Sequence, residues 1–195
     1  MFLDNGLSFN TNVSSAQSLT LSGSNADSTT VIDITGAGAG TAPKIINGFS
    51  QANTAIGADY GVGDGIASPY VVVIVTAVTT VTGTLTITLQ AAPDNGSYSA
   101  GTYTTLFTST GITGASMLYA PSVAGNLGGS VFYFPVPPIL ASMGEALPRF
   151  YKLNYAASGA ITISVNSFMT INPASFALQK SIMLGGVYNS NFQAG

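Results

Sequence analysis

The feature that most constrains the fold is the alternation of side chains over residues 148–171, PRFYKLNYAASGAITISVNSFMTI. Apolar residues take every second position on either side of a break at Ser158-Gly159. Successive side chains of a β-strand point to opposite faces, so each run places one row in a core and one row outside. Gly159 can adopt the positive φ that a tight turn needs. The pattern therefore predicts a long antiparallel hairpin.

Further short strand signals precede this stretch, at the spacing typical of sandwiches and barrels. The run from Pro69 is apolar on both parities, which is typical of a central strand covered on both faces. In the next run, Leu85, Ile87 and Leu89 alternate with polar residues and are predicted to face the core. Together the signals predict an all-β fold, an antiparallel β-sandwich of about eight to nine strands. The other predicted strands cover residues 18–22, 28–34, 103–109, 115–120 and 130–135.

The length of 195 residues and the absence of linker-like composition predict one domain over residues 1–171. Residues 36–68 are rich in glycine and lack periodicity, so we predict a long loop with one helical turn near 50–55. A further helical turn is expected at 139–146. Residues 172–195 begin with Asn172-Pro173, which ends the last predicted strand, and we predict that they form a C-terminal extension or arm with one short helical stretch.

Charged residues make up only 6% of the chain, whereas about 25% is typical of soluble domains. A surface of this kind either relies on Ser, Thr, Asn and Gln for solubility or is covered by partners. The net charge is −3 and no cluster of Lys or Arg is present, so nucleic-acid binding is not expected. Without any resemblance to known proteins, these features indicate an extracellular or virion β-domain that binds something.

Cysteine and histidine are both absent, so the usual zinc, copper and non-haem iron sites are not expected, and no cofactor is predicted. Nucleophilic hydrolysis commonly needs a base beside Ser, and paired acids for glycoside hydrolysis are hard to find because Glu145 is the only glutamate. We therefore predict that the protein is not an enzyme. The N-terminus does not resemble a signal peptide, and no apolar run approaches the ~20 residues of a membrane span.

Two loop motifs partly resemble ligand sites. Gly36, Gly38 and Gly40 follow a strand, but their spacing and the nearby proline do not match a dinucleotide fingerprint. Asp59 and Asp64 lie in a glycine-rich segment that superficially suggests a Ca²⁺ loop, yet the alternating ligands of an EF-hand are missing. Both motifs are interpreted as loop structure, with no metal site predicted.

The order of several segments resembles the jelly-roll cement, or decoration, proteins on the capsids of tailed double-stranded-DNA bacteriophages. The resemblance covers roughly residues 1–171 and includes no catalytic motif. It implies a jelly-roll sandwich on the outer capsid surface of a virion that binds the major capsid protein, with a homodimer as the expected form. The matching segments are MFLDNGLSF, STTVIDI, PYVVVIVTAVTTVTGTLTITLQAAPDNG, YTTLF, PRFYKLNY and ITISVNSFMTI.

Apolar residues in the two terminal segments, together with two basic residues at the start of the predicted hairpin, are the candidate partner contacts. The basic pair has a second interpretation, as solvated charges that protect a strand edge. Two other functions stay open: a host-receptor or glycan-binding module of a tail fibre or spike, using Tyr60 and Tyr98, and a major coat protein. The candidate contacts are Met1, Phe2, Leu3, Arg149, Lys152, Phe176, Ile182, Met183, Tyr188 and Phe192.

Overall fold

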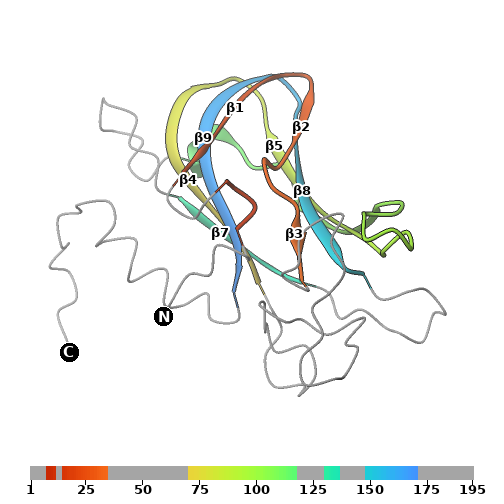
Figure 1. Ribbon diagram of the computed structural model, residues 1–195. Helices are drawn as coiled ribbons and strands as arrows, with labels where there is room; N and C mark the ends of the chain where they lie inside the picture. The colour runs from red at the N-terminus through yellow and green to blue at the C-terminus, as the bar shows by residue number, and fades with distance from the viewer. Residues whose placement is uncertain (1–7, 12–14, 35–69, 118–129, 137–147, 171–195) are drawn as a thin grey trace, which may run out of the picture.

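The computed structural model describes residues 8–11, 15–34, 70–117, 130–136 and 148–170 (Figure 1). These residues form nine β-strands and one short helix. The strands make two antiparallel sheets that pack face to face, so the predicted all-β sandwich is confirmed. The described part of the chain contains no helix long and apolar enough to cross a membrane.

Each sheet combines strands that are distant in sequence. The first sheet has the order β1 (Gln17–Ser22), β9 (Ala160–Thr170), β4 (Tyr70–Val81) and β7 (Val131–Pro135). The second sheet has the order β2 (Asn25–Asp27), β8 (Phe150–Ala157), β5 (Leu85–Ala92) and β6 (Thr104–Thr108), and β3 (Ile32–Asp33) also pairs with β8.

The centre of the fold is one antiparallel ribbon that is bent in half. Residues 70–92 run antiparallel to residues 150–170, first as β4 against β9 and then as β5 against β8. At the bend, the Thr84 amide donates to the Ser158 hydroxyl at 2.9 Å and the Ser158 amide donates to the Thr84 carbonyl at 3.1 Å. Figure 1 shows these connections, with the one between β1 and β2, arching over the same end of the sandwich.

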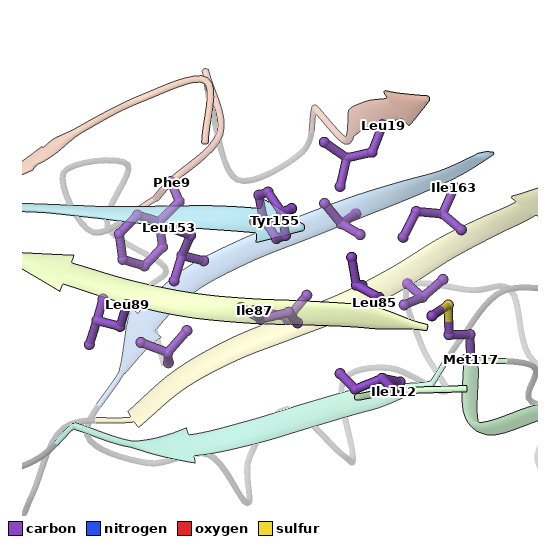
Figure 2. Packing of buried hydrophobic residues seen from close by; sticks show 14 of the residues in the cluster. Phe9, Leu19, Leu85, Ile87, Leu89, Ile112, Met117, Leu153, Tyr155 and Ile163 are labelled. Carbon is purple, nitrogen blue, oxygen red and sulfur yellow. The ribbon is translucent and has the colours of Figure 1, made fainter. Parts of the chain in front are cut away.

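Bending the ribbon buries the same row of side chains in both sheets. Odd-numbered residues face the core from Tyr151 to Ala157 on β8 and from Ile161 to Val165 on β9. Gly159, at the bend, is the odd-numbered position between these two buried rows. Leu85, Ile87 and Leu89 face the core from β5, as predicted. Figure 2 shows these rows packed together between the sheets. Burial of each such aliphatic or aromatic side chain stabilises the folded state by about 1.5–3 kcal/mol.

The predicted hairpin at 148–171 is wrong in its pairing, although both of its strands exist. β8 pairs with β2, β3 and β5, whereas β9 pairs with β1 and β4 in the opposite sheet. Ser158-Gly159 is therefore a corner between sheets. Alternation of side chains specifies which face is buried, and it is equally satisfied by a hairpin and by a strand that bends from one sheet to the other.

Two local predictions are also corrected. The strand expected at 28–34 is reduced to β3. The Ser28 amide still donates to the Leu153 carbonyl of β8 at 2.7 Å, but the Thr30 amide donates to the Phe9 carbonyl at 2.9 Å instead of to β8. Between β1 and β3, Asn25–Asp27 form the short strand β2. The edge strand expected from Ala115 is instead the helical turn α1 (Gly114–Met117), which places Met117 in the core (Figure 2).

Strands predicted at 18–22, 103–109 and 130–135 are confirmed as β1, β6 and β7. The turn after Ala92 contains Gly96 at a φ of 87°. The predicted loop at 36–68, the helical turn at 139–146 and the extension at 172–195 lie outside the described residues.

Candidate functional site

The two lateral sides of the sandwich differ, and the side formed by β1 and β2 is closed. The Gln17 side chain joins the two sheets there: its amide nitrogen donates to the Asp27 carbonyl at 2.8 Å, and its oxygen accepts from the Thr29 amide at 3.1 Å. Farther along, Phe9 is fully buried in the core and its amide bonds to the Ser167 carbonyl at 2.9 Å. Among the described residues, these contacts hold the two sheets together along this side.

Within the part of the chain that the structure describes, the opposite side, between the edge strands β6 and β7, is open. Leu106 and Phe107 of β6 and Phe132 and Phe134 of β7 pack against the core while remaining partly exposed. The Phe107 and Phe134 rings lie 5.0 Å apart, centroid to centroid, in a tilted arrangement that favours aromatic contact. The pairing of β5 with β6 shifts register between Leu89 and Gln90. At this irregularity two successive residues of β6, Leu106 and Phe107, both pack against the core.

A groove of about 440 Å³ lies along this open side. Ligand sites in proteins commonly have volumes of 300–1,000 Å³ and apolar walls with a few polar groups. Aromatic rings and hydroxyl groups line the groove, and none of its lining residues is charged. Its lining residues are Phe107, Thr108, Ser109, Thr110, Gly111, Ile112, Ser116, Phe132 and Phe134.

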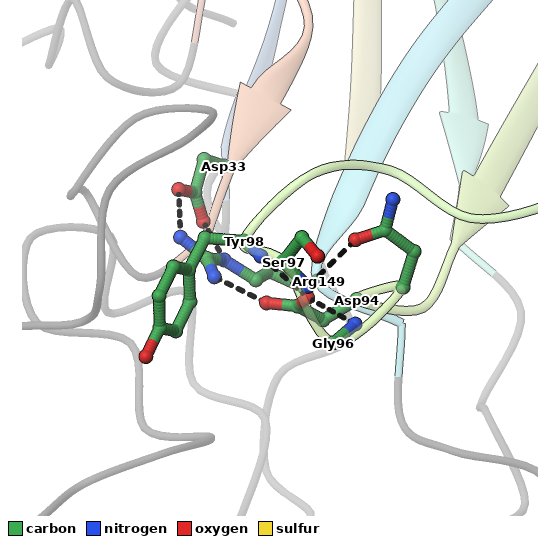
Figure 3. Close-up of polar contacts among 7 residues, drawn as sticks. Asp33, Asp94, Gly96, Ser97, Tyr98 and Arg149 are labelled. Carbon is green, nitrogen blue, oxygen red and sulfur yellow. Dashed lines mark hydrogen bonds and ion pairs between the residues drawn. The ribbon is translucent and has the colours of Figure 1, made fainter.

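The second notable site surrounds Arg149, directly before β8 at the end of the sandwich opposite the bend. Arg149 is only 3% exposed, and its guanidinium forms a two-point contact with the Asp33 carboxylate: Nε donates to Oδ1 at 3.0 Å and Nη2 donates to Oδ2 at 2.8 Å. A further ion pair joins Nη1 to Asp94, and the guanidinium lies 4.8 Å from the Phe150 ring centroid. Arg149 therefore links β3, β8 and the loop that follows β5 (Figure 3).

The electrostatics of this cluster favour the charged forms of its members. The hydrogen bond to Asp33 is the largest effect, and it outweighs burial, so the pKa of Arg149 is raised. Burial acts to raise the pKa of Asp94, but hydrogen bonds from Arg149 and from the amides of Gly96 and Tyr98 outweigh it and hold the pKa below its ordinary value. Arg149 and Asp94 thus stay ionised at neutral pH.

Tyr98 lies in the loop fastened by this cluster. Its φ of 61° is in the left-handed region, and it is the only residue other than glycine with a positive φ in the part of the chain that the structure describes. A tyrosine in this conformation carries a backbone strain of about 1 kcal/mol or more. Its side chain is 42% exposed, and the Arg149 guanidinium carbon lies 5.9 Å from the ring centroid (Figure 3).

Lys152, the other predicted basic contact, lies on the outer face of β8. Its amino group pairs with Asp27 at 2.6 Å and lies 4.5 Å from the centroid of the Tyr103 ring. Burial acts to raise the pKa of Asp27, but hydrogen bonds from Lys152 and Asn154 lower it by more, so the pKa falls below its ordinary value. Burial and the charge of Asp27 raise the pKa of Tyr103.

The described ranges contain five charged side chains. Each of the five takes part in one of these ion pairs. Arg149 pairs with Asp33 and Asp94, and Lys152 pairs with Asp27. Strands β1, β4, β5, β6, β7 and β9 carry no charged residue. The described sandwich therefore presents a nearly neutral surface, and the whole open side is uncharged.

Among the predicted partner contacts, Arg149 is buried and its guanidinium pairs with Asp33 and Asp94. We therefore do not propose a salt contact between Arg149 and a partner. Lys152 is partly exposed, with its charge paired to Asp27. The remaining predicted contacts lie outside the described residues: Met1, Phe2, Leu3, Phe176, Ile182, Met183, Tyr188 and Phe192.

The sequence carries no local signal for the open side, because the phenylalanines of β6 and β7 lie far apart in the chain and are brought together by the arrangement of the two sheets. Within the described residues, no three acidic side chains gather in a way that could hold a metal ion. Comparison with models of known protein families gave no match, and no curated protein is significantly similar to the chain.

Proposed function

We propose that the protein is a non-catalytic structural protein of a bacteriophage virion. In this proposal it is a jelly-roll cement protein that binds the outer surface of the capsid, as a homodimer, and bridges subunits of the major capsid protein. The observation that carries the proposal is the neutrality of the surface: every charged side chain of the described sandwich is paired with another.

Neutrality matters because a cement protein works by burying its surface against subunits that are already assembled. An unpaired charge buried in such a contact would lose its hydration without compensation. A surface of hydroxyl groups, amides and aromatic rings avoids this desolvation penalty. Many modest contacts, repeated around the shell, then add through multivalency.

The strand order supports the jelly-roll part of the proposal. The orders β1-β9-β4-β7 and β2-β8-β5-β6 arise when an antiparallel ribbon is wrapped so that its two halves form facing sheets. Eight-stranded double sheets of this kind are typical of viral capsid and lectin domains. The fold alone suits several functions, so the assignment depends on the character of the surface.

The open side between β6 and β7 is the best candidate for a protein contact. Its two edge strands have, among the described residues, partners on one side only, and exposed strand edges are ready templates for pairing. Partly exposed phenylalanines line the adjoining groove. A neighbouring capsid subunit or a second copy of the protein would bury both features together.

The experiment is cosedimentation of the purified protein with capsid shells assembled without it, followed by heating of the shells. Saturable binding that raises the rupture temperature is the expected result. Absence of binding to shells, with retention on host-cell glycans, would overturn the proposal in favour of a receptor-binding module. Light scattering of the free protein would test the homodimer.

Two threonine variants locate the contact. Thr108→Glu introduces a charge on β6 at the groove, and Thr20→Glu introduces the same charge on the outer face of β1; both threonines are exposed. We expect Thr108→Glu to weaken shell binding by at least about tenfold, since the new carboxylate would be buried without a partner. Thr20→Glu serves as the matched control and should bind normally.

A further inference from the structure

The loop between β5 and β6 holds Tyr98 in a position that a simple connection would not require. A turn position with a positive φ is ordinarily occupied by Gly, Asn or Asp. In the same loop, Gly96 occupies such a position. Tyr98 also has a positive φ, and 42% of its surface is exposed. A strained, exposed aromatic residue is a mark of a site shaped for contact.

The loop is rigid because its own polar groups hydrogen-bond one another. The Asp94 Oδ1 atom accepts from the amides of Gly96 at 2.8 Å and Tyr98 at 2.9 Å. The Asn95 amide donates to the Ser99 carbonyl at 2.9 Å, and the base is closed by the Gly101 amide and the Pro93 carbonyl at 2.8 Å. The conformation of Tyr98 is therefore fixed before any partner arrives.

The loop is also fastened to the sandwich through a buried cation. Asp94 uses its second oxygen to pair with Arg149, whose guanidinium is held by two contacts to Asp33 (Figure 3). The Tyr98 ring lies beside the same guanidinium, 5.9 Å from its carbon. One continuous chain of contacts thus runs from the interior of the fold to the exposed ring.

The chemistry of the loop indicates what it binds. Both Asp94 oxygens are occupied, and the Asn95 side-chain oxygen accepts from the Ser97 amide at 2.8 Å. A glycan site would keep such oxygens available for sugar hydroxyls, whereas here the loop offers mainly an aromatic ring and its hydroxyl. Rigid tyrosines flanked by Ser, Gly and Asn are typical of surfaces that bind proteins.

We propose that Tyr98 is the anchor residue through which this end of the sandwich binds the capsid shell, at an uncharged protein surface. This preference follows from the loop, because both oxygens of Asp94 are occupied and the loop offers mainly an aromatic ring and its hydroxyl. The inference rests on the proposed function for the identity of the partner, and it adds a second contact to the open side between β6 and β7.

The test uses Tyr98→Asn, because asparagine accepts a positive φ and the variant removes the ring while relieving strain. We expect the variant to fold with an equal or higher urea midpoint and to bind empty shells about 10- to 100-fold more weakly. Tyr98→Phe keeps the ring and should retain most of the binding. Val31→Asn removes another exposed apolar side chain and serves as the control.

The outcomes separate the two proposals. Binding by the native protein with no loss in Tyr98→Asn would overturn the role of Tyr98 and leave the cement function standing. Failure of the native protein to bind shells would overturn the cement function and with it the partner assigned here. Retention of the native protein on a glycan array, lost in Tyr98→Asn, would assign Tyr98 to a sugar and overturn the inference.

Discussion

Gly83 and Gly159 lie in backbone contact at the bend of the central ribbon. A β-carbon added to Gly83 would come within 2.7 Å of the Gly159 α-carbon and closer still to its nitrogen. The two corners by which the chain passes from one sheet to the other are therefore packed against each other. Their contact allows both halves of the ribbon to keep the same face toward the core.

We expect Gly83→Ala to destabilise the protein by about 2–3 kcal/mol, because the contact is with backbone atoms that cannot rotate away. Gly159→Ala should have a smaller effect, since its added carbon would meet Gly83 backbone atoms at 3.2–3.3 Å. Urea unfolding of the two variants measures the difference. Equal destabilisation, or none in Gly83→Ala, would contradict the packing of the corners.

Removal of the buried cation should be far more damaging than removal of the exposed one. Arg149→Met leaves the carboxylates of Asp33 and Asp94 without their cation, and we expect a loss of about 3–5 kcal/mol. Lys152→Met breaks a partly exposed pair with Asp27 and should change stability by about 0–1 kcal/mol. Similar losses in the two variants, measured by urea unfolding, would count against the buried network.

The contact between Arg149 and Asp94 should weaken in acid. The folded-state pKa of Asp94 lies below its ordinary value of 3.8, so its contribution to stability is fully present above pH 3.8. The contribution is lost as the pH falls below 3.8 and through the folded-state pKa. We therefore expect the stability difference between the native protein and Asp94→Asn to shrink between pH 5 and pH 2.

Urea unfolding at several pH values measures this difference. Because both proteins share the other carboxylates, subtraction isolates the effect of Asp94. A difference that stays constant down to pH 2 would show that Asp94 is not stabilised by its partners in the folded protein.

A buried polar network joins the N-terminal segment to both sheets. The Tyr155 hydroxyl donates to Ser167 at 2.8 Å, and the Ser167 hydroxyl and amide donate to the Asn10 side-chain oxygen at 3.0 and 2.7 Å. The Asn10 side-chain nitrogen donates to the Val165 carbonyl at 3.0 Å. Burial raises the pKa of Tyr155, so its hydroxyl remains a donor throughout the ordinary pH range.

We expect Tyr155→Phe to lower the free energy of unfolding by about 1 kcal/mol, since Ser167 keeps its bonds to Asn10. Asn10→Ala should lower it by about 2–4 kcal/mol, because buried groups of Ser167 and Val165 would lose their partners. The same urea series measures both. A smaller loss in Asn10→Ala than in Tyr155→Phe would show that the N-terminal segment is not a working part of the network.

Much of the sandwich could be predicted because alternation is a local property. The rows containing Tyr151, Leu153 and Ile163 are buried as the sequence indicated, and the turn at Asp94–Gly96 follows from side-chain and backbone preferences of adjacent residues. The low charge was equally plain from composition. Each of these signals depends only on neighbours in the chain.

Strand pairing could not be predicted in the same way. The two runs around Gly159 satisfy the alternation rule either as a hairpin or as parts of two sheets. What decided between them was the availability of residues 70–92, which pair along the full length of both runs. Contacts between segments so distant in sequence leave no periodic signal in either segment.

The candidate sites divide along the same line. The sequence by itself determined that the surface would be nearly uncharged and that the chain would bury one face of each strand. Only the tertiary structure decided that Arg149 is buried between Asp33 and Asp94, that Tyr98 is held exposed beside it, and that the side between β6 and β7 is open. The physical reason is that burial and ion pairing depend on which distant segments meet, and the pairing of β8 with β3 and β5 is what brings Arg149 to Asp33 and Asp94.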